Sequence, residues 1–206
     1  MDFKEETIKV YDRAAEHYSA EKNIHFWVEE YPKFVQLLKG KKIIDIGCGA
    51  GRDAIVFTHD GFEYTGIDAS AGMLNIAAQV APEGTYKKMD FDQLEFPDNT
   101  FDGFWAAASF LHTTKASVLK PLLEAKRVIK SGGVGFISLK EQNGMSEGMI
   151  EEKKRWGGIA RYFAFYEQDE FAKEIRKAGL EIVDQSKHIE DDERKTVWLC
   201  YFVKKP

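Results

Sequence analysis

Short apolar runs alternate with longer amphipathic segments along most of this chain. The runs have the length of β-strands, and the segments between them repeat apolar positions at helical spacing. The pattern predicts helices over residues 51–60, 70–80, 116–129 and 169–178, and strands over residues 43–46, 64–67, 85–89, 103–107, 135–139, 180–184 and 197–203. Strands that alternate with helices are typical of an α/β fold built on a parallel sheet.

The end of the chain departs from this alternation. The last two predicted strands follow each other without a helix and are joined by a charged turn at residues 190–194. Strands joined so closely pair in antiparallel fashion. We therefore predict a doubly wound α/β fold: a seven-stranded, mostly parallel sheet with an antiparallel C-terminal hairpin strand and helices on both faces.

Two segments lie outside the regular pattern. In residues 1–40 aromatic and aliphatic side chains recur mostly at helical spacing, and Gly40 stands where a helix would end. We expect an N-terminal cap of two short helices there, followed by the main domain over residues 41–206. Residues 141–166, approximately, form a polar connection that is longer than the fold requires, which is typical of a lid.

The composition narrows the classes of partner. The 206 residues include 29 Lys and Arg against 34 Asp and Glu, and the formal charge of −5 disfavours nucleic acid. No apolar run is long enough to span a membrane, and the polar start does not resemble a signal peptide, so we expect a cytoplasmic protein. We expect it to be a monomer or a homodimer.

No metal is expected. Cys48 and Cys200 give neither a disulfide framework nor paired metal ligands. The acidic residues 191–193 lie on a turn that is expected to be solvated.

The stretch IIDIGCGAGRDA, residues 43–54, is the most informative. A buried strand is followed by Gly47, Gly49 and Gly51 and then by a helix, an arrangement that brings backbone amides close to a ligand. The dinucleotide fingerprint needs its third glycine where this chain has Arg52, so a nicotinamide cofactor is disfavoured. Asp45 would repel a pyrophosphate but suits a ligand that carries an ammonium or sulfonium group.

A second acidic residue follows the next predicted strand. Asp68 stands about 20 residues after the glycine turn, where a carboxylate can accept hydrogen bonds from both hydroxyls of a ribose. The alternative is that Asp68 helps Ser70 to cap the following helix. The spacing from the glycine turn favours the ribose interpretation.

Together these motifs resemble those of the class I S-adenosylmethionine-dependent methyltransferases, in particular small-molecule methyltransferases with a type 11 or type 25 domain. The resemblance runs from residue 43 to the C-terminus and rests on DIGCGAGRD, GIDAS, MDFDQLEFPDNTFD and RVIKSGGVGFIS. Ser131 replaces the proline that is usual in the last motif. The resemblance implies a Rossmann-like fold, S-adenosylmethionine as the cofactor and S-adenosylhomocysteine as the product.

The resemblance also assigns parts of the cofactor to residues. It implies that the three glycines line the methionine portion, that Asp68 binds the ribose, that Met73 packs against adenine, and that Asp90 and the backbone of Phe91 recognise the adenine edge. Cys48 is expected in the turn for its size. The complete predicted cofactor site is Asp45, Gly47, Cys48, Gly49, Gly51, Arg52, Asp68, Ala69, Met73, Asp90, Phe91 and Ala106.

Candidates for the methyl acceptor site follow the fourth predicted strand. His112 can orient the acceptor or take a proton from it, because the ordinary pKa of histidine lies near 6.5. Equally, His112 can hydrogen-bond the backbone at the start of the next helix. Trp105 lies within a strand buried on both faces and is expected in the core.

The long connection resembles a subgroup of small-molecule methyltransferases in which the fifth strand ends in Ser-x-Lys and an Arg-Tyr-Phe tripeptide precedes the next helix. The matching residues are Ser138, Lys140, Arg161, Tyr162 and Phe163. Arg161 or Lys140 can hold a carboxylate or phosphate of the substrate, or be solvated or ion-paired with Glu141 and Glu167. The predicted catalytic set is His112, Arg161, Lys140 and Tyr162.

The expected function is therefore transfer of a methyl group to a small-molecule acceptor by in-line displacement. The chain has neither an Asn-Pro-Pro-Tyr-like tetrapeptide after the fourth strand nor a Pro-Cys pair, the features used to methylate nucleic-acid bases. Two alternatives stay open at this point: a module that binds the cofactor without catalysis, and a tRNA-modifying methyltransferase.

Overall fold

The computed structural model describes residues 3–20, 26–151, 160–190 and 195–206, without the side chains of residues 17–20. The helices are α1 (Phe3–Ala20), α2 (Glu30–Leu37), α3 (Arg52–His59), α4 (Ala71–Val80), η1 (Phe110–His112, a 3-10 helix), α5 (Leu119–Val128) and α6 (Gln168–Lys177). The strands are β1 (Lys42–Ile46), β2 (Glu63–Asp68), β3 (Thr85–Lys88), β4 (Phe101–Ala107), β5 (Ile129–Lys140), β6 (Glu147–Glu151), β7 (Ala160–Ala164), β8 (Glu181–Ile189) and β9 (Val197–Lys204). Every strand and helix predicted for the main domain is present, with shifted bounds.

The main sheet has the order β3-β2-β1-β4-β5-β9-β8. β1 pairs in parallel with β2 and β4, and β4 pairs in parallel with β5. β9 is antiparallel to both of its neighbours, β5 and β8, and so runs against the other strands of this sheet. The predicted doubly wound fold with an antiparallel C-terminal hairpin is confirmed.

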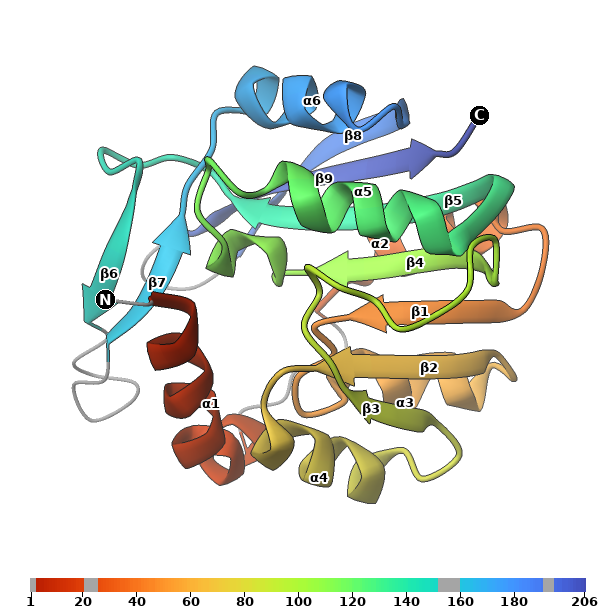
Figure 1. Ribbon diagram of the computed structural model, residues 1–206, viewed down its shortest axis with the longest axis horizontal. Helices are drawn as coiled ribbons and strands as arrows, with labels where there is room; N and C mark the ends of the chain where they lie inside the picture. The colour runs from red at the N-terminus through yellow and green to blue at the C-terminus, as the bar shows by residue number, and fades with distance from the viewer. Residues whose placement is uncertain (1–2, 21–25, 152–159, 191–194) are drawn as a thin grey trace.

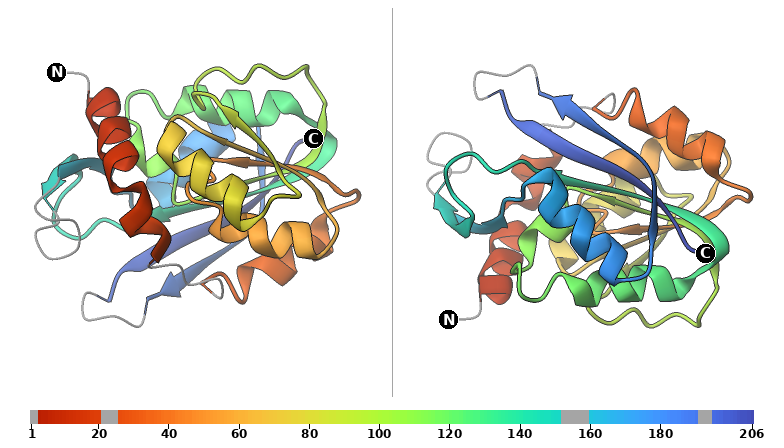
Figure 2. Two further views of the ribbon diagram at one scale, coloured as in Figure 1. Left: turned by 90° about the horizontal axis from the view of Figure 1, so that it is seen from below. Right: turned by 90° about the horizontal axis from the view of Figure 1, so that it is seen from above.

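Helices cover both faces of the sheet, as predicted. α2 and α3 lie on one face, and α5 and α6 lie on the other (Figure 2). Phe34 of α2 and Phe57 of α3 are fully buried against the sheet, and both rings contact the ring of Trp105. Trp105 also stacks on Phe136 with 4.0 Å between ring centroids, so its predicted place in the core is confirmed.

The carboxyl ends of the parallel strands form the edge at which this class of fold binds ligands. From β1 the sheet continues outward to β2 and β3 on one side and to β4 and β5 on the other. Such a switch point leaves a crevice, because the connections after neighbouring strands depart in opposite directions. Figure 1 shows α1 and the small β6–β7 sheet beside this edge.

The N-terminal section is helical, but its first helix is longer than predicted. α1 has 18 residues and α2 has eight. α2 packs against β5 and belongs to the core of the main domain, whereas α1 packs against α4 and β7 beside the carboxyl edge. The division into a cap and a main domain at residue 41 stays a prediction.

The predicted lid contains two β-strands that its polar composition did not indicate. β6 and β7 pair in antiparallel fashion as a separate two-stranded sheet. Tyr162 and Phe163 of β7 are each 3% exposed, so the apolar residues of this segment are concentrated in one buried strand. Residues 152–159 lie outside the described residues, and the lid function stays a prediction.

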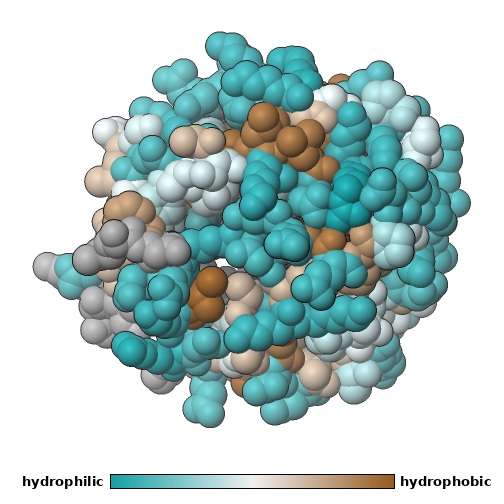
Figure 3. Space-filling model, in the orientation of Figure 1, coloured by the Kyte–Doolittle hydropathy of each residue, from teal (hydrophilic) through white to brown (hydrophobic). Residues whose placement is uncertain are grey.

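The face of the molecule drawn in Figure 3 is mainly polar, and hydrophobic residues form small, separate patches on it. Within the described ranges, no helix combines the length and the apolar character needed to cross a membrane.

Candidate functional site

The glycine turn joins β1 to α3 at the carboxyl edge. Gly47, Gly49 and Gly51 have φ angles of 79°, 54° and 78°, in the left-handed region that strains other residues. A Cβ atom at Gly47 would stand 2.4 Å from Cβ of Ser109, and one at Gly51 would stand 2.9 Å from Cα of Ala77, so these two glycines permit close packing within the protein. A Cβ atom at Gly49 would meet no atom within 4 Å. Gly49 therefore faces open space, as a glycine that lies against a ligand should.

Asp68, at the end of β2, borders the same turn. One carboxylate oxygen accepts a hydrogen bond from the backbone N–H of Gly49 (2.9 Å), and the other accepts one from Ser70 N–H (2.8 Å). Burial raises the pKa of Asp68 to about 6, and the backbone hydrogen bonds act in the opposite direction. The cap of α4 is supplied by Ser70, whose Oγ accepts from Met73 N–H at 3.1 Å. Ribose binding by Asp68 stays a prediction.

Asp45 lies beneath the turn. It is 2% exposed, and the hydroxyl of Tyr64 donates a hydrogen bond to its carboxylate at 2.6 Å. Burial, and after it the charge of Asp53, raises the pKa of Asp45 well above its ordinary value. Asp45 thus links β1 to β2 within the sheet, and its role toward a sulfonium stays a prediction.

Arg52 turns toward α2. Its guanidinium donates to both carboxylate oxygens of Asp53, at 2.7 and 2.8 Å, and lies 5.2 Å from the ring centroid of Phe26 and 5.6 Å from that of Trp27. Asp53 also accepts a hydrogen bond from Nε1 of Trp105 at 2.8 Å. Arg52 therefore links α3 to the aromatic residues that precede α2. Direct contact of Arg52 with a cofactor stays a prediction.

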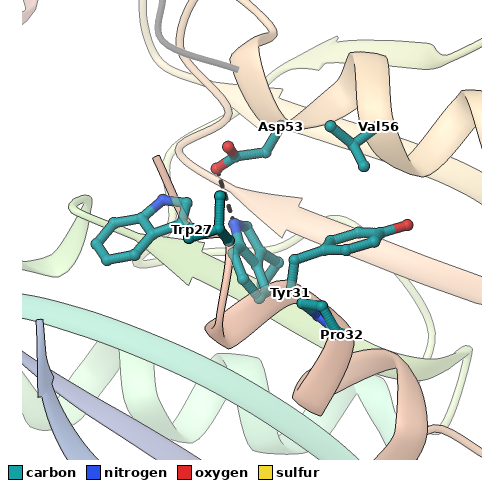
Figure 4. Close-up of a pocket in the computed structure, with 7 residues that line it drawn as sticks. Trp27, Tyr31, Pro32, Asp53 and Val56 are labelled. Atoms are coloured by element: carbon teal, nitrogen blue, oxygen red, sulfur yellow. Dashed lines mark hydrogen bonds between the residues drawn. The ribbon is translucent and has the colours of Figure 1, made fainter. Parts of the chain in front are cut away.

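A pocket of about 250 Å³ lies beside this group (Figure 4). Helices α2 and α3 supply most of its wall, which is largely apolar. The lining residues are Trp27, Val28, Tyr31, Pro32, Asp53, Val56 and Trp105. None of the predicted cofactor or acceptor residues lines this pocket, and we assign it no part in methyl transfer.

Asp90 and Phe91, predicted to recognise adenine, are joined to helix α1 through Lys4. The Lys4 ammonium donates to Asp90 at 2.5 Å and to Asp92 at 2.6 Å. It also lies 4.5 Å from the ring centroid of Phe91. Lys4 is a residue of this side of the site that the sequence did not indicate.

Met73 is buried between α1 and the glycine turn. It is 1% exposed and clusters with Ala15 of α1 and Ala50 of the turn. α1 is fastened here by Asp12, whose carboxylate accepts hydrogen bonds from Ser70 Oγ (2.7 Å) and Gly72 N–H (2.9 Å). The remaining predicted cofactor residues lie at the ends of β1, β2 and β4, and they are Cys48, Ala69 and Ala106.

Three residues from distant segments meet where the sequence predicts the acceptor site: Tyr11 of α1, His112 of η1 and Arg161 of β7. The Tyr11 hydroxyl lies 2.7 Å from Nε2 of His112 and accepts a hydrogen bond from Nη1 of Arg161 at 2.5 Å. The other ring nitrogen of His112, Nδ1, lies 2.7 Å from the carbonyl oxygen of Tyr162. The structure thus joins two predicted catalytic residues, His112 and Arg161, through a tyrosine that the sequence had indicated only as part of an apolar helix face.

The hydrogen bonds of His112 fix its protonation. A carbonyl oxygen can only accept, so Nδ1 must carry a proton. Burial, and after it the positive charge of Arg161, lowers the pKa of His112 to about 3. The ring is therefore neutral near pH 7, and Nε2 accepts the proton of the Tyr11 hydroxyl. The general-base role of His112 is not tested by this arrangement.

Ser138 positions the segment that carries His112. Ala108 has a φ of 58°, an uncommon value for a residue with a side chain, and it turns the chain from β4 toward η1. The buried Oγ of Ser138 accepts a hydrogen bond from Ala108 N–H at 2.9 Å. The serine of the Ser-x-Lys pair thus has a structural role.

Lys140 and Tyr162 lie near these three residues. The ammonium of Lys140 lies 4.4 Å from the ring centroid of Phe163, and Cζ of Arg161 lies 5.1 Å from the same centroid. The Tyr162 hydroxyl donates to Glu147 at 2.5 Å, so Tyr162 contributes its backbone carbonyl to His112 and not its side chain.

No group of three or more His, Cys, Asp or Glu side chains in the described residues can hold a metal ion. The acidic residues 191–193, expected on a solvated turn, lie outside the described residues.

Comparison with known proteins agrees with this geometry. Residues 43–133 match a family model described as a methyltransferase domain. A demethylmenaquinone methyltransferase from Symbiobacterium thermophilum is 32% identical over 150 residues, which are 63% of this chain and 57% of that protein. A ubiquinone biosynthesis O-methyltransferase from Bradyrhizobium sp. is 29% identical over 168 residues, 77% of this chain and 65% of that protein. The chain thus spans somewhat more than half of the length of these relatives.

A solved structure shows the same fold. A SAM-dependent methyltransferase from Methanosarcina mazei superposes with a TM-score of 0.77 at 18% identity, over 85% of this chain and 97% of that one. The sheet order defines a Rossmann-like fold. Together with this fold, the match of residues 43–133 and the similarity to named methyltransferases support a class I S-adenosylmethionine-dependent methyltransferase, with S-adenosylmethionine as the cofactor. The open space at Gly49 lies beside the Asp68 carboxylate.

Proposed function

We propose that this chain transfers a methyl group from S-adenosylmethionine to a small-molecule acceptor by in-line displacement. The observation that carries the proposal is the contact between the two sides of the site. Ser109, which precedes η1 and His112, lies so close to Gly47 of the cofactor turn that no side chain fits between them. The polar residues of the acceptor side therefore belong to the same crevice as the turn.

The position of α1 supports a small acceptor. α1 reaches Asp90 through Lys4 at one side of the crevice, and at the other side Thr7 Oγ1 accepts a hydrogen bond from Tyr162 N–H at 3.1 Å. An edge covered in this way suits a small molecule better than a folded nucleic acid, and the formal charge of −5 agrees. The two relatives are named for demethylmenaquinone and for ubiquinone biosynthesis, and both compounds are small molecules.

The residues of the chain perform the alignment that methyl transfer requires. When bound, S-adenosylmethionine supplies a methyl carbon attached to a positively charged sulfur. The glycine turn lines the methionine portion of the cofactor, Asp68 holds its ribose, and α1 excludes water from the crevice. Arg161, only 7% exposed, and Lys140 hold an anionic group of the acceptor such as a carboxylate.

A screen of small-molecule acceptors that detects S-adenosylhomocysteine tests the proposal. We expect release of S-adenosylhomocysteine only when a suitable acceptor is present. S-adenosylhomocysteine at 100 times its dissociation constant should also stabilise the fold by about 2.7 kcal/mol, and NAD should not. Stabilisation without turnover of any acceptor would instead favour a module that binds the cofactor without catalysis. Stabilisation by NAD but not by S-adenosylhomocysteine would contradict the cofactor assignment.

A further inference from the structure

Tyr11 lies outside every motif of the sequence, yet it stands where the two sides of the site meet. Its ring packs against the cluster of Ala15, Ala50 and Met73, which includes the glycine turn. Its hydroxyl contacts His112 and Arg161. One side chain therefore joins the cofactor turn to the residues predicted to handle the acceptor.

His112 has no ring nitrogen that faces the acceptor directly. Nδ1 donates to the carbonyl of Tyr162, and Nε2 accepts from the Tyr11 hydroxyl. The ring is also enclosed by aromatic neighbours, with Tyr11 edge-on at 5.3 Å and Phe163 tilted at 4.9 Å between centroids. The polar group that the imidazole supports is thus the Tyr11 hydroxyl.

We propose that Tyr11 is the side chain that contacts the nucleophilic group of the acceptor, and that His112 is a positioning residue that acts through the Tyr11 hydroxyl. This inference rests on the proposed function. Because the proton of the hydroxyl is directed at Nε2, the Tyr11 oxygen is held in one orientation toward the crevice. A nucleophile that carries a proton donates it in a hydrogen bond to this oxygen, which aims its electron pair at the methyl carbon.

The transfer step balances without a base in the protein. The electron pair of the acceptor forms the new bond to the methyl carbon, and the carbon–sulfur bond breaks with its electrons going to sulfur. The methylated product keeps the proton of the nucleophile, as a cationic species, until it leaves the site and releases the proton to bulk water. His112 does not take it, because a ring desolvated beside Arg161 resists a second positive charge.

Three variants measured with an acceptor from the screen test this arrangement. Tyr11→Phe should lower kcat by about 10- to 100-fold and change the affinity for S-adenosylhomocysteine by less than about threefold. His112→Ala should lower kcat to a similar extent. His112→Gln should keep kcat within about fivefold of the wild type, because its side-chain carbonyl can accept the Tyr11 proton where Nε2 did. A glutamine cannot act as a base, so this recovery distinguishes positioning from general-base catalysis.

Thr7→Val is the matched control. Thr7 lies one turn earlier on α1, is 3% exposed, and its hydroxyl also contacts β7 through Tyr162 N–H. This variant removes a hydroxyl that docks α1 but leaves Tyr11 in place, and we expect kcat within about threefold of the wild type. Equal losses in Thr7→Val and Tyr11→Phe would show that only the docking of α1 matters and would overturn the proposal.

A measurement without any acceptor completes the test. In histidine-ring ¹⁵N NMR spectra of the full chain, Tyr11→Phe should shift the Nε2 resonance of His112, and Thr7→Val should not. An unshifted resonance, wild-type turnover in Tyr11→Phe, or a His112→Gln variant as slow as His112→Ala would overturn the proposal. Failure of the proposed function would appear differently, as a wild-type chain that releases no S-adenosylhomocysteine with any acceptor.

Discussion

The proposed cofactor side and the proposed acceptor side of the site are built in different ways. On the cofactor side the Asp68 carboxylate meets the backbone N–H groups of Gly49 and Ser70, which lie 19 and 2 residues away in the sequence. On the acceptor side Arg161 reaches Tyr11 across 150 residues, and His112 reaches it across 101. A site made from one carboxylate and the backbone groups of two consecutive β-turn-α units is encoded in short sequence motifs. A site made from side chains of three separate segments exists only once the fold has formed.

The two sides also differ in charge. Burial raises the pKa values of Asp45 and Asp68 on the cofactor side, where both carboxyls lie close to the turn. The acceptor side presents Arg161 and Lys140 around the ring of Phe163. Mutations on the two sides should therefore affect binding of the cofactor and handling of the acceptor separately.

The largest loss of cofactor affinity is expected when a side chain fills the open space beside Gly49. Gly49→Ala should lower the affinity for S-adenosylhomocysteine by more than about 100-fold, because the added methyl group occupies the space left for the ligand. Gly61→Ala is the matched control: Gly61 also has a positive φ, 74°, and open space around its Cβ position, but it lies after α3. Both variants should lose about 1 to 2 kcal/mol of stability from backbone strain. Equal affinities, measured by isothermal calorimetry, would show that no ligand lies against Gly49.

Removal of the carboxylate beside the turn should have the next largest effect. Asp68→Ala should weaken binding of S-adenosylhomocysteine by about 1.5 to 3 kcal/mol, since hydrogen bonds to a charged acceptor are lost. Ser70→Ala removes the cap of α4 and should cost about 1 kcal/mol of stability with a much smaller change in affinity. If the two variants lose affinity equally, Asp68 acts mainly by supporting the turn.

The raised pKa of Asp68 makes binding on the cofactor side depend on pH. Ribose hydroxyls donate to the ionised carboxylate, so binding favours the deprotonated form and affinity should rise as the pH increases through about 6. Between pH 7 and pH 5 the ionised fraction falls roughly tenfold, and affinity should fall by about as much. Without ligand the sign is opposite, because the folded chain binds this proton more tightly than the unfolded chain and gains stability from it as the pH falls from about 6 toward 4. Titration of Asp68→Asn should show no such change in affinity.

The smallest change in cofactor affinity is expected from a mutation on the proposed acceptor side. Arg161→Gln should leave the affinity for S-adenosylhomocysteine within about threefold, roughly 0.7 kcal/mol. It should raise the KM for an anionic acceptor, with a smaller change in kcat, because a guanidinium that holds an anion contributes to binding. A large loss of cofactor affinity with an intact melting temperature would show that the two sides are not separate.

Much of the fold could be predicted because its signals are local. Alternating apolar runs gave the strands, and the glycine turn and Asp68 marked the carboxyl edge through their spacing. β7 was missed because the residues Arg161 to Phe163 are part of a polar connection, and their burial depends on packing against α1 and η1. No pattern within a short window contains that information.

The acceptor side shows the same limit more clearly. His112 was selected by its position after the fourth strand, and Arg161 by the resemblance of its Arg-Tyr-Phe tripeptide to a methyltransferase subgroup. The structure brings the two residues together. In the sequence, Tyr11 contributed only to the apolar periodicity of a helix. The role of its hydroxyl became visible only in the structure, where His112 and Arg161 lie beside it. From the sequence alone, a tyrosine in such an amphipathic helix cannot be told apart from the other aromatic residues of its apolar face.

The docking of α1 also orders events during synthesis. Synthesis runs from the N-terminus to the C-terminus, so α1 emerges before its partners Ser70, Asp90, His112 and Arg161. At about 5 to 20 residues per second, Arg161 follows Tyr11 after roughly 8 to 30 s. Contacts that close such long loops form late, since the loop entropy must be overcome first. The N-terminal helix α1 therefore completes its contacts only after residue 161 has been made, when most of the main sheet is already available for it to dock against.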